Sequence, residues 1–381
     1  MRSSNLKLVM PIDLSRYRGE FPVTHSSIYM NHAAVGPISR RVLQAMVKLL
    51  EDVHHHGVEH GETWLEACEA TRRSAARLLN ADPGEIAFTK NTSEGISFFA
   101  NGLDWQSGDE VVSIAGEFPA NFYPWKLQER RGVLLRLVEE TEGRLSLEAL
   151  ARALTPRTRV VAVSYVQFLS GFRLDLEKLG ALCAEHGCLL FVDAIQGLGA
   201  FPVDVRRCRI AGLAADGHKW ILGPEGAAVM FLNREVIDKV SPSTVGWTSV
   251  RGWRDYSSRD FIWREDASRF EAGTLNTAGL YGLGAALDLL LEVGIDAVSE
   301  RILDLTGRLR RGLRDLGHQI FGPLEPCEAS GIVSFVPRQG TPRDAAVRLR
   351  AHRVQVSERC GKVRLSPHFY NTQEEIDLVL D

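Results

Sequence analysis

A lysine stands at the end of an apolar run, where a charged side chain is costly to bury. Lys219 follows "AGLAADGH", residues 211–218, and precedes the turn "GPEG", residues 223–226. Such a lysine must be neutralised, paired or used covalently, and burial lowers its pKa toward the range that Schiff-base formation needs. Taken alone, however, a lysine in such a sequence is more often a surface residue.

Other polar side chains also follow apolar runs. Asp193 follows "CLLFV", with Gln196 one helical step further on, and Thr92 and Ser93 introduce the segment "SEGISFFANGL". Hydroxyls and free amides at a helix N-terminus form a cup for an anion, and phosphate is the favoured guest, with an ordinary helix cap as the alternative. Asp193 is either another helix cap or the partner of a buried cation, such as a protonated pyridine nitrogen.

Seven short β-rich runs between about residues 85 and 235 must position these side chains. They are "EIAFT", "EVVSIAG", "VLLRLV", "RVVAVSYV", "CLLFVDA", "AGLAADG" and "AAVMFL". Their alternation with helical stretches predicts an α/β fold with a mainly parallel seven-stranded sheet, in which ligands collect at the carboxyl ends of the strands. The run "AAVMFL" follows its predecessor after only a tight turn, so we expect it to be antiparallel.

The flanking segments indicate further helices and a second domain. Residues 37–80 form a long helical region that should break near Gly57 and Gly61. The last hundred residues alternate helical and strand patterns, which is typical of a small α+β domain. We therefore predict a large domain over residues 27–278 and a small domain formed by residues 1–26 and 279–381.

The composition limits the classes of partner. The 381 residues are 45% hydrophobic and carry a net charge of -3 without a basic stripe, which argues against nucleic acid and for a small molecule. No run is long enough to span a bilayer, and six scattered cysteines indicate a reducing cytoplasm rather than a disulfide framework. The histidines of "VHHHGVEH", residues 53–60, read as a solvated helix end, so no metal site is predicted.

Several blocks together resemble a known family. These are "TSEG", "EFPANFYPW", "FVDAIQGLG", "GHKWILGPEG" and "RFEAGTLNTAGLYGLGAAL", and the likeness runs from "YMNHAAVGPIS" to "SPHFYNTQEEID". The chain looks like a class V aminotransferase-family protein among the fold-type I enzymes that use pyridoxal 5'-phosphate (PLP). The nearest group contains cysteine desulfurases, selenocysteine lyases and isopenicillin N epimerase-like proteins.

The resemblance implies a role for each cofactor-site residue. Lys219 would bond covalently to the cofactor aldehyde and shuttle the substrate α-proton, Asp193 would keep the pyridine nitrogen protonated, and Gln196 would bind the ring hydroxyl oxygen. The phosphate would be held by Thr92, Ser93 and His218. Thr274 would reach the phosphate of a neighbouring subunit, which implies a homodimer with its active site at the interface.

The resemblance also implies how an amino-acid substrate is bound. Arg364 matches the arginine that grips the substrate carboxylate, and Arg359 is a weaker candidate nearby. Asn31 and His32 belong to a segment that often lines the substrate pocket, although an ordinary polar loop is nearly as favoured. Gln167 is a candidate for a further polar contact.

The sequence departs from the desulfurase pattern at three positions. Asp216 replaces the usual serine before Gly-His-Lys, and its charge would repel a phosphate. Pro119 replaces the ring-stacking histidine, so Phe118 or Phe122 is expected to cover the cofactor ring. Phe168 replaces an asparagine, beside Gln167.

These features lead to an ordered set of expected reactions. Transamination is the first choice because it needs only Lys219 and a carboxylate clamp. The alternatives are C–S cleavage of the cysteine desulfurase or selenocysteine lyase type, and epimerisation or racemisation. Cys360 lies in "SERCGK", which joins two predicted strands too directly for a long mobile loop, so an incidental thiol is favoured over a sulfur-accepting one.

Overall fold

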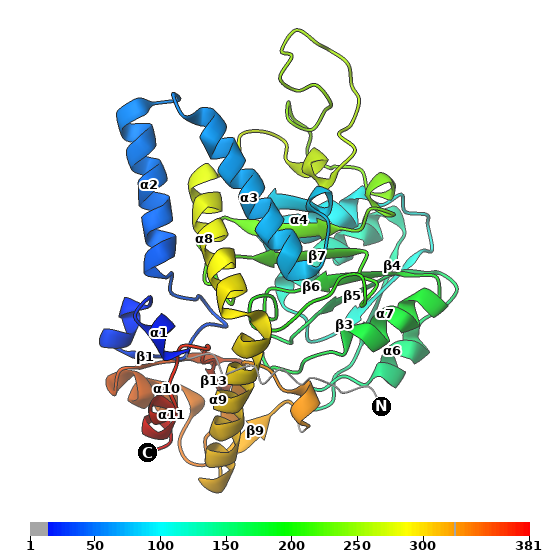
Figure 1. Cartoon of the computed structure of the whole chain (residues 1–381). Coiled ribbons are helices and arrows are strands. Elements are labelled where there is room, and N and C mark those ends of the chain that lie inside the picture. Colours follow the sequence, from blue (N-terminus) through cyan, green and yellow to red (C-terminus); the bar gives the residue numbers. More distant parts are fainter. Residues whose placement is uncertain (1–13, 324) are drawn as a thin grey trace, which may run out of the picture.

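The computed structural model describes residues 14–323 and 325–381, and a central seven-stranded sheet organises it (Figure 1). The strand order is β2-β8-β7-β6-β5-β3-β4. The strands are β2 (Ile86–Thr89), β3 (Glu110–Ile114), β4 (Leu134–Val138), β5 (Thr158–Ser164), β6 (Leu189–Asp193), β7 (Gly212–Asp216) and β8 (Ala228–Leu232). Only β8 runs against its neighbours, so the predicted sheet and its one antiparallel strand are confirmed.

Burial on both faces explains why the strands are continuous apolar runs. Every residue of β2, β3, β7 and β8 is buried, whereas the edge strand β4 is mostly exposed. A parallel sheet has helices on both faces, so its strands cannot alternate between apolar and polar residues. This burial leaves the carboxyl ends of the strands as the places where polar side chains gather.

The helices of this part of the chain are α2 (Arg40–His56), α3 (Gly61–Leu79), α4 (Thr92–Gly102), α5 (Tyr123–Lys126), α6 (Leu147–Ala153), α7 (Leu176–Glu185) and α8 (Thr277–Val293). Among them, α2 and α3 pack against α8. The predicted break falls between α2 and α3, where Gly57 has a positive φ of 58°. Helix α4 packs tightly on β7, because a Cβ at Gly95 would lie 2.8 Å from the Cβ of Ala214.

The C-terminal part forms a smaller α+β unit. Its antiparallel sheet has the order β12-β13-β10-β9, and the N-terminal β1 pairs in parallel with β11. Its elements are α9 (Ile295–Asp315), β9 (Gln319–Phe321), β10 (Val333–Val336), α10 (Pro342–Ala351), β11 (Val354–Gln355), β12 (Ser357–Arg359), β13 (Lys362–Leu365) and α11 (Gln373–Leu380). The N-terminal segment contributes α1 (Ser15–Arg18) and β1 (Ile28–Tyr29).

The predicted domain boundaries stay a prediction. Strand β1 falls inside the predicted large domain but pairs with β11, and residues 1–13 of the predicted small domain lie outside the described residues. No single helix in the described part of the chain has the length and apolar composition of a membrane span; α8 and α9 pass that test only as a pair bent by 81°.

Candidate active site

A cavity of about 580 Å³ lies where the carboxyl ends of β6 and β7 meet the C-terminal unit. Both strands end in a carboxylate, Asp193 and Asp216, and Lys219 follows β7. The two basic residues that face them come from β12 and β13 of the C-terminal sheet. The polar lining consists of Asn91, Thr92, Ser93, Asp193, Gln196, Asp216, His218, Lys219, Arg359, Cys360 and Arg364.

Lys219 is held firmly by its backbone. The carbonyl oxygen of His218 accepts a 2.7 Å hydrogen bond from the amide of Gly36, and a Cβ at Gly36 would lie 2.3 Å from the Lys219 carbonyl oxygen. Only glycine allows this approach. Burial lowers the pKa of the Lys219 ammonium to about 8, although Asp193 favours the charged form. The lysine is therefore partly neutral near physiological pH, as a nucleophilic lysine must be.

Asp193 lies at the end of β6 and is almost fully buried. Its Oδ1 accepts a 3.0 Å hydrogen bond from the amide of Ile195. Burial raises the pKa of this carboxyl to about 6, against the opposing influences of the Ile195 amide and Lys219. A protonated ring nitrogen placed against Asp193 would supply the positive partner that the buried carboxylate lacks.

Gln196 is oriented by two neighbours. Its Oε1 accepts a 2.8 Å hydrogen bond from the indole of Trp220, and its Nε2 donates to the carbonyl of Ala33 at 3.0 Å. An amide nitrogen carries two hydrogens, so one N–H is left for a ligand oxygen. This agrees with the predicted contact to a ring hydroxyl oxygen, which stays a prediction.

The start of α4 has the features of an anion cup. The side chain of Asn91 caps the helix by accepting from the amide of Glu94 at 3.0 Å. The amides of Thr92 and Ser93 in the first turn have no intrahelical acceptor because of their position. Thr92 Oγ1 accepts from the Asp216 amide at 3.0 Å, which ties the end of β7 to this helix. A phosphate here would meet free amides and the positive end of the helix dipole.

Asp216 and His218 lie close together in the same cavity. His218 Nδ1 is 3.0 Å from Asp216 Oδ2, the distance of an ion pair without the angles of a hydrogen bond. Within the described residues, neither Asp216 Oδ1 nor His218 Nδ1 has a hydrogen-bond partner, and both are buried. The His218 imidazole thus lies beside the Asp216 carboxylate, next to the predicted phosphate site.

Arg364 reaches the cavity from β13 and is 2% exposed. One of its terminal nitrogens donates to the Phe168 carbonyl at 2.7 Å, and its Nε lacks a partner among the described residues. Burial, with help from the nearby Arg359, lowers the pKa of the guanidinium to about 10. A buried guanidinium without a carboxylate partner among the described residues is suited to bind the carboxylate of a substrate.

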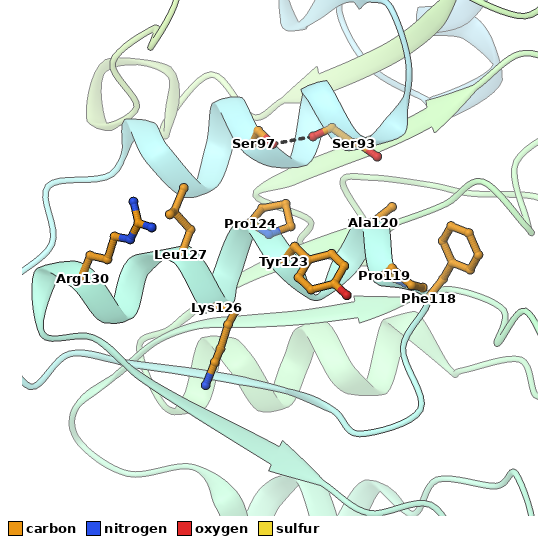
Figure 2. A pocket seen from close by; sticks show the side chains of 10 residues that line it. All are labelled: Ser93, Ser97, Phe118, Pro119, Ala120, Tyr123, Pro124, Lys126, Leu127 and Arg130. Carbon is orange, nitrogen blue, oxygen red and sulfur yellow. Dashed lines mark hydrogen bonds between the residues drawn. The ribbon is translucent and has the colours of Figure 1, made fainter.

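Phe118 lies above the lysine. The Lys219 Nζ is 5.6 Å from the centre of its ring, and the ring packs edge-on against Phe168 at 5.3 Å. Phe118 also borders an open groove of about 770 Å³ that shares Ser93, Pro119 and Ala120 with the main cavity (Figure 2). This placement suits the predicted role of Phe118 in covering a cofactor ring.

Five predicted residues lie outside the lining of this cavity, among them Phe122, the alternative to Phe118. His32 is fully buried, with Nδ1 at 2.7 Å from the Ser366 carbonyl oxygen and Nε2 at 2.6 Å from the Tyr370 hydroxyl. Asn31 accepts a hydrogen bond from the Ser357 hydroxyl. The other two are Gln167 and Thr274, which line two further cavities.

The structure adds a buried carboxyl that the sequence reasoning did not single out. Glu117 accepts from the Ser164 amide at 2.7 Å and from Gln167 Nε2 at 3.1 Å. Burial raises the pKa of Glu117 to about 7, and the nearby Asp193 adds to this effect. The position of Glu117 directly after an apolar run is the feature of the sequence that could have identified it. Residues 14–323 and 325–381 contain no group of three or more His, Cys, Asp or Glu that could hold a metal ion.

Comparisons with known proteins agree with this geometry. A family model described as Aminotransferase class-V matches residues 28–379. A probable cysteine desulfurase of Pyrococcus abyssi (strain GE5 / Orsay) is 32% identical over 384 residues, covering 95% of both chains. The apo structure of a cysteine desulfurase from Thermococcus onnurineus NA1 has a TM-score of 0.87 and 28% identity, covering 96% of both chains.

A second solved protein is similar and holds the cofactor. C-DES, a cystine C–S lyase seen with its product cysteine persulfide, has a TM-score of 0.89 and 26% identity, covering 94% of this chain and 98% of its own. A variant of C-DES carries glycine covalently linked to PLP. In the present chain the largely buried lysine, the buried carboxylate and the helix N-terminus in one cavity fit an aldehyde, a pyridine nitrogen and a phosphate. The chain belongs to the class V aminotransferase family of fold-type I enzymes, and its cofactor is PLP.

Proposed function

We propose that this protein cleaves the C–S bond of a cysteine-type amino acid and transfers the sulfur to Cys360, as a cysteine desulfurase does. The observation that carries the proposal is that Cys360 lines the same cavity as Lys219 and Arg364. The name of the Pyrococcus abyssi relative supports the same chemistry. The proposal follows the alternative in the sequence analysis, because the first choice, transamination, gives Cys360 no role and is not confirmed by the comparisons.

Each side chain of the cavity would have a separate role in the reaction. PLP, when bound, supplies an electron sink for negative charge that develops at the substrate α-carbon. Arg364 would bind the substrate carboxylate, and Asp193 would keep the ring nitrogen protonated. Lys219, with its pKa lowered to about 8, would take and return the proton at the α-carbon. Phe118, above Lys219, would exclude water from that proton transfer.

Cys360 sits in a tight turn rather than on a mobile loop. Cys360 and Gly361 join β12 to β13, and both have positive φ angles, 47° and 70°. Two such residues form the two-residue turn preferred in hairpins, which fixes the thiol at the cavity wall. In the overall step the substrate C–S bond breaks, a S–S bond forms at Cys360 Sγ, and cysteine leaves as alanine.

Product analysis tests the proposal. The holoenzyme is mixed with L-cysteine, L-cystine or L-alanine, and alanine, pyruvate, 2-oxo acids and protein-bound sulfur are measured. We expect alanine and a persulfide on Cys360 from L-cysteine. The variant Cys360→Ser should lose both, whereas Cys327→Ser, which removes another exposed thiol, should keep both. Amino-group transfer from L-alanine to a 2-oxo acid would instead establish transamination, and pyruvate formation that survives in Cys360→Ser would remove Cys360 from the reaction.

We also propose a homodimer with the active site at its interface, in the cytoplasm. Thr274 lines a cavity other than that of Lys219, so a phosphate contact from Thr274 requires another subunit. Helix α2 offers a surface for the association of two subunits, since an exposed apolar stripe runs along it. The stripe consists of Leu43, Val47, Leu50 and Val53. Light scattering should give twice the chain mass, and a monomer that retains full activity would contradict the proposal.

A further inference from the structure

A second cavity, of about 290 Å³, lies behind Cys360 and shares Phe168 and Cys360 with the Lys219 cavity. The ends of β3 and β5, the turn between β4 and α6, and Phe321 of β9 enclose it. No role in the proposed reaction uses this space. We call it the rear cavity.

The polar side chains of the rear cavity offer hydrogen-bond acceptors. Gln167 is 2% exposed and donates to Glu117 through Nε2, while its buried Oε1 has no hydrogen-bond partner within the described chain. Glu140 is half-buried and makes neither a hydrogen bond nor an ion pair with any described residue. Burial raises the pKa of Glu140, so this carboxylate would gain from a cationic partner.

Gly116 creates the room for the Glu140 carboxylate. A Cβ at Gly116 would lie 1.7 Å from Glu140 Oε2, so any side chain there would displace the carboxylate. Lys362, two residues after Cys360, packs its Nζ 4.2 Å from the centre of the Phe321 ring and donates to the Cys360 carbonyl at 3.3 Å. The two described side chains Lys362 and Glu140 form no ion pair.

Cys360 thus lies between two cavities with different charged groups. The Lys219 cavity holds Asp193 and Asp216 as well as three cationic side chains, whereas the described lining of the rear cavity has Glu117 and Glu140 and no lysine or arginine. We propose that the rear cavity binds a primary ammonium group, so that small aminothiols and their disulfides are the molecules that approach Cys360 from this side. Glu140 and the free Gln167 Oε1 accept the ammonium hydrogens, and the aliphatic part lies against Phe168 and Phe321.

This subsite goes beyond C–S cleavage and does not require it. If Cys360 does carry sulfur, an aminothiol held in the rear cavity is placed to unload it. Its thiolate attacks the outer sulfur of the Cys360 persulfide, a S–S bond forms to the aminothiol, and the Cys360 Sγ–S bond breaks to release the Cys360 thiolate. The aminothiol leaves as a persulfide.

The test measures the chemical reactivity of Cys360 and not turnover. Holoenzyme with Cys327→Ser is treated with 2-aminoethyl, 2-sulfonatoethyl or methyl methanethiosulfonate, and modification of Cys360 is followed by peptide mass spectrometry. In each case the Cys360 thiolate displaces methanesulfinate and forms a disulfide. Each rate of Cys360 modification is normalised by the rate at which free cysteine reacts with the same reagent.

The normalised rate of the ammonium reagent relative to the methyl reagent should fall roughly fivefold in Glu140→Gln, because one nearby negative charge is lost. Glu142→Gln, on the same turn but exposed, removes the same charge and should leave this ratio unchanged. An equal ratio in Glu140→Gln and the parent protein overturns the proposal. Equal falls in Glu140→Gln and Glu142→Gln also overturn it, since they would indicate a general surface field. A failure of C–S cleavage leaves this readout intact, so the two proposals are judged separately.

Discussion

The substitution Lys219→Met should stabilise the apoprotein while abolishing covalent PLP attachment. Burial lowers the pKa of Lys219 from 10.5 to about 8. At about 1.36 kcal/mol per pKa unit, this lowering corresponds to a cost of about 3 kcal/mol for the charged lysine in the folded state. Methionine has a similar length and no charge. The lowered pKa already includes the attraction between Lys219 and Asp193, so we expect a net gain of about 3 kcal/mol at pH 7.

The direction of the pKa shift determines how this difference in stability changes with pH. Lys219 has a lower pKa folded than unfolded, so its cost is fully present below pH 8, shrinks between about 8 and 10.5, and is absent above that range. The advantage of Lys219→Met over the parent apoprotein should follow the same course. Urea titrations of the two PLP-free proteins at pH 7, 8, 9 and 10 give the difference in the free energy of unfolding.

The matched control is Lys178→Met, which removes an exposed lysine and should change stability by less than about 0.5 kcal/mol at every pH. The double variant Asp193→Asn/Lys219→Met removes both buried charges and should be at least as stable as Lys219→Met. A Lys219→Met apoprotein that is no more stable than the parent at pH 7 would refute the claim that a costly buried charge is stored at this position.

Three further predictions test other parts of the structure. Arg364→Lys keeps the charge but loses the planar fork, so KM for the amino acid should rise at least tenfold while the PLP absorbance spectrum stays unchanged. Arg72→Met leaves the Glu271 carboxylate, now 2.7 Å from an Arg72 nitrogen, buried without its partner; urea titration should show a loss of about 3 to 5 kcal/mol, partly restored by adding Glu271→Gln. His218→Asn should weaken PLP binding in a fluorescence titration, and adding Asp216→Asn should restore part of it because no unpaired carboxylate then faces the phosphate; equal losses in the single and double variants would exclude the pairing.

The central sheet and one half of the site were accessible from the sequence for a physical reason. Strands buried on both faces appear as uninterrupted apolar runs, and the topology of a parallel sheet brings the residues after those runs together. Asp193, Lys219 and the start of α4 therefore meet in one cavity, although 127 positions separate Thr92 from Lys219 (219 minus 92).

The placement of His32 and Gln167 depended on partners that no local pattern reveals. His32 is held by Ser366 and Tyr370, more than 330 positions away, and Gln167 is held by Glu117, 50 positions earlier. A polar residue near a pocket turns toward whichever acceptor or donor the tertiary fold supplies. For these two segments the sequence predicted the approach to the site, but not which side chains face it.

Burial of charge alone does not identify a functional residue in this protein. Arg72 is as buried as Arg364, but Glu271 neutralises it and the pair joins α3 to the segment before Thr274. Arg310 is buried without a carboxylate partner in the described part of the chain, and burial lowers its pKa to about 10. It donates to the carbonyls of residues 323 and 332 and so fixes α9 to the strand β10 region. Arg364 combines an unneutralised charge with a place on a cavity wall. A buried charge indicates a ligand only where both conditions hold, because the fold must leave the opposite charge to be supplied from outside.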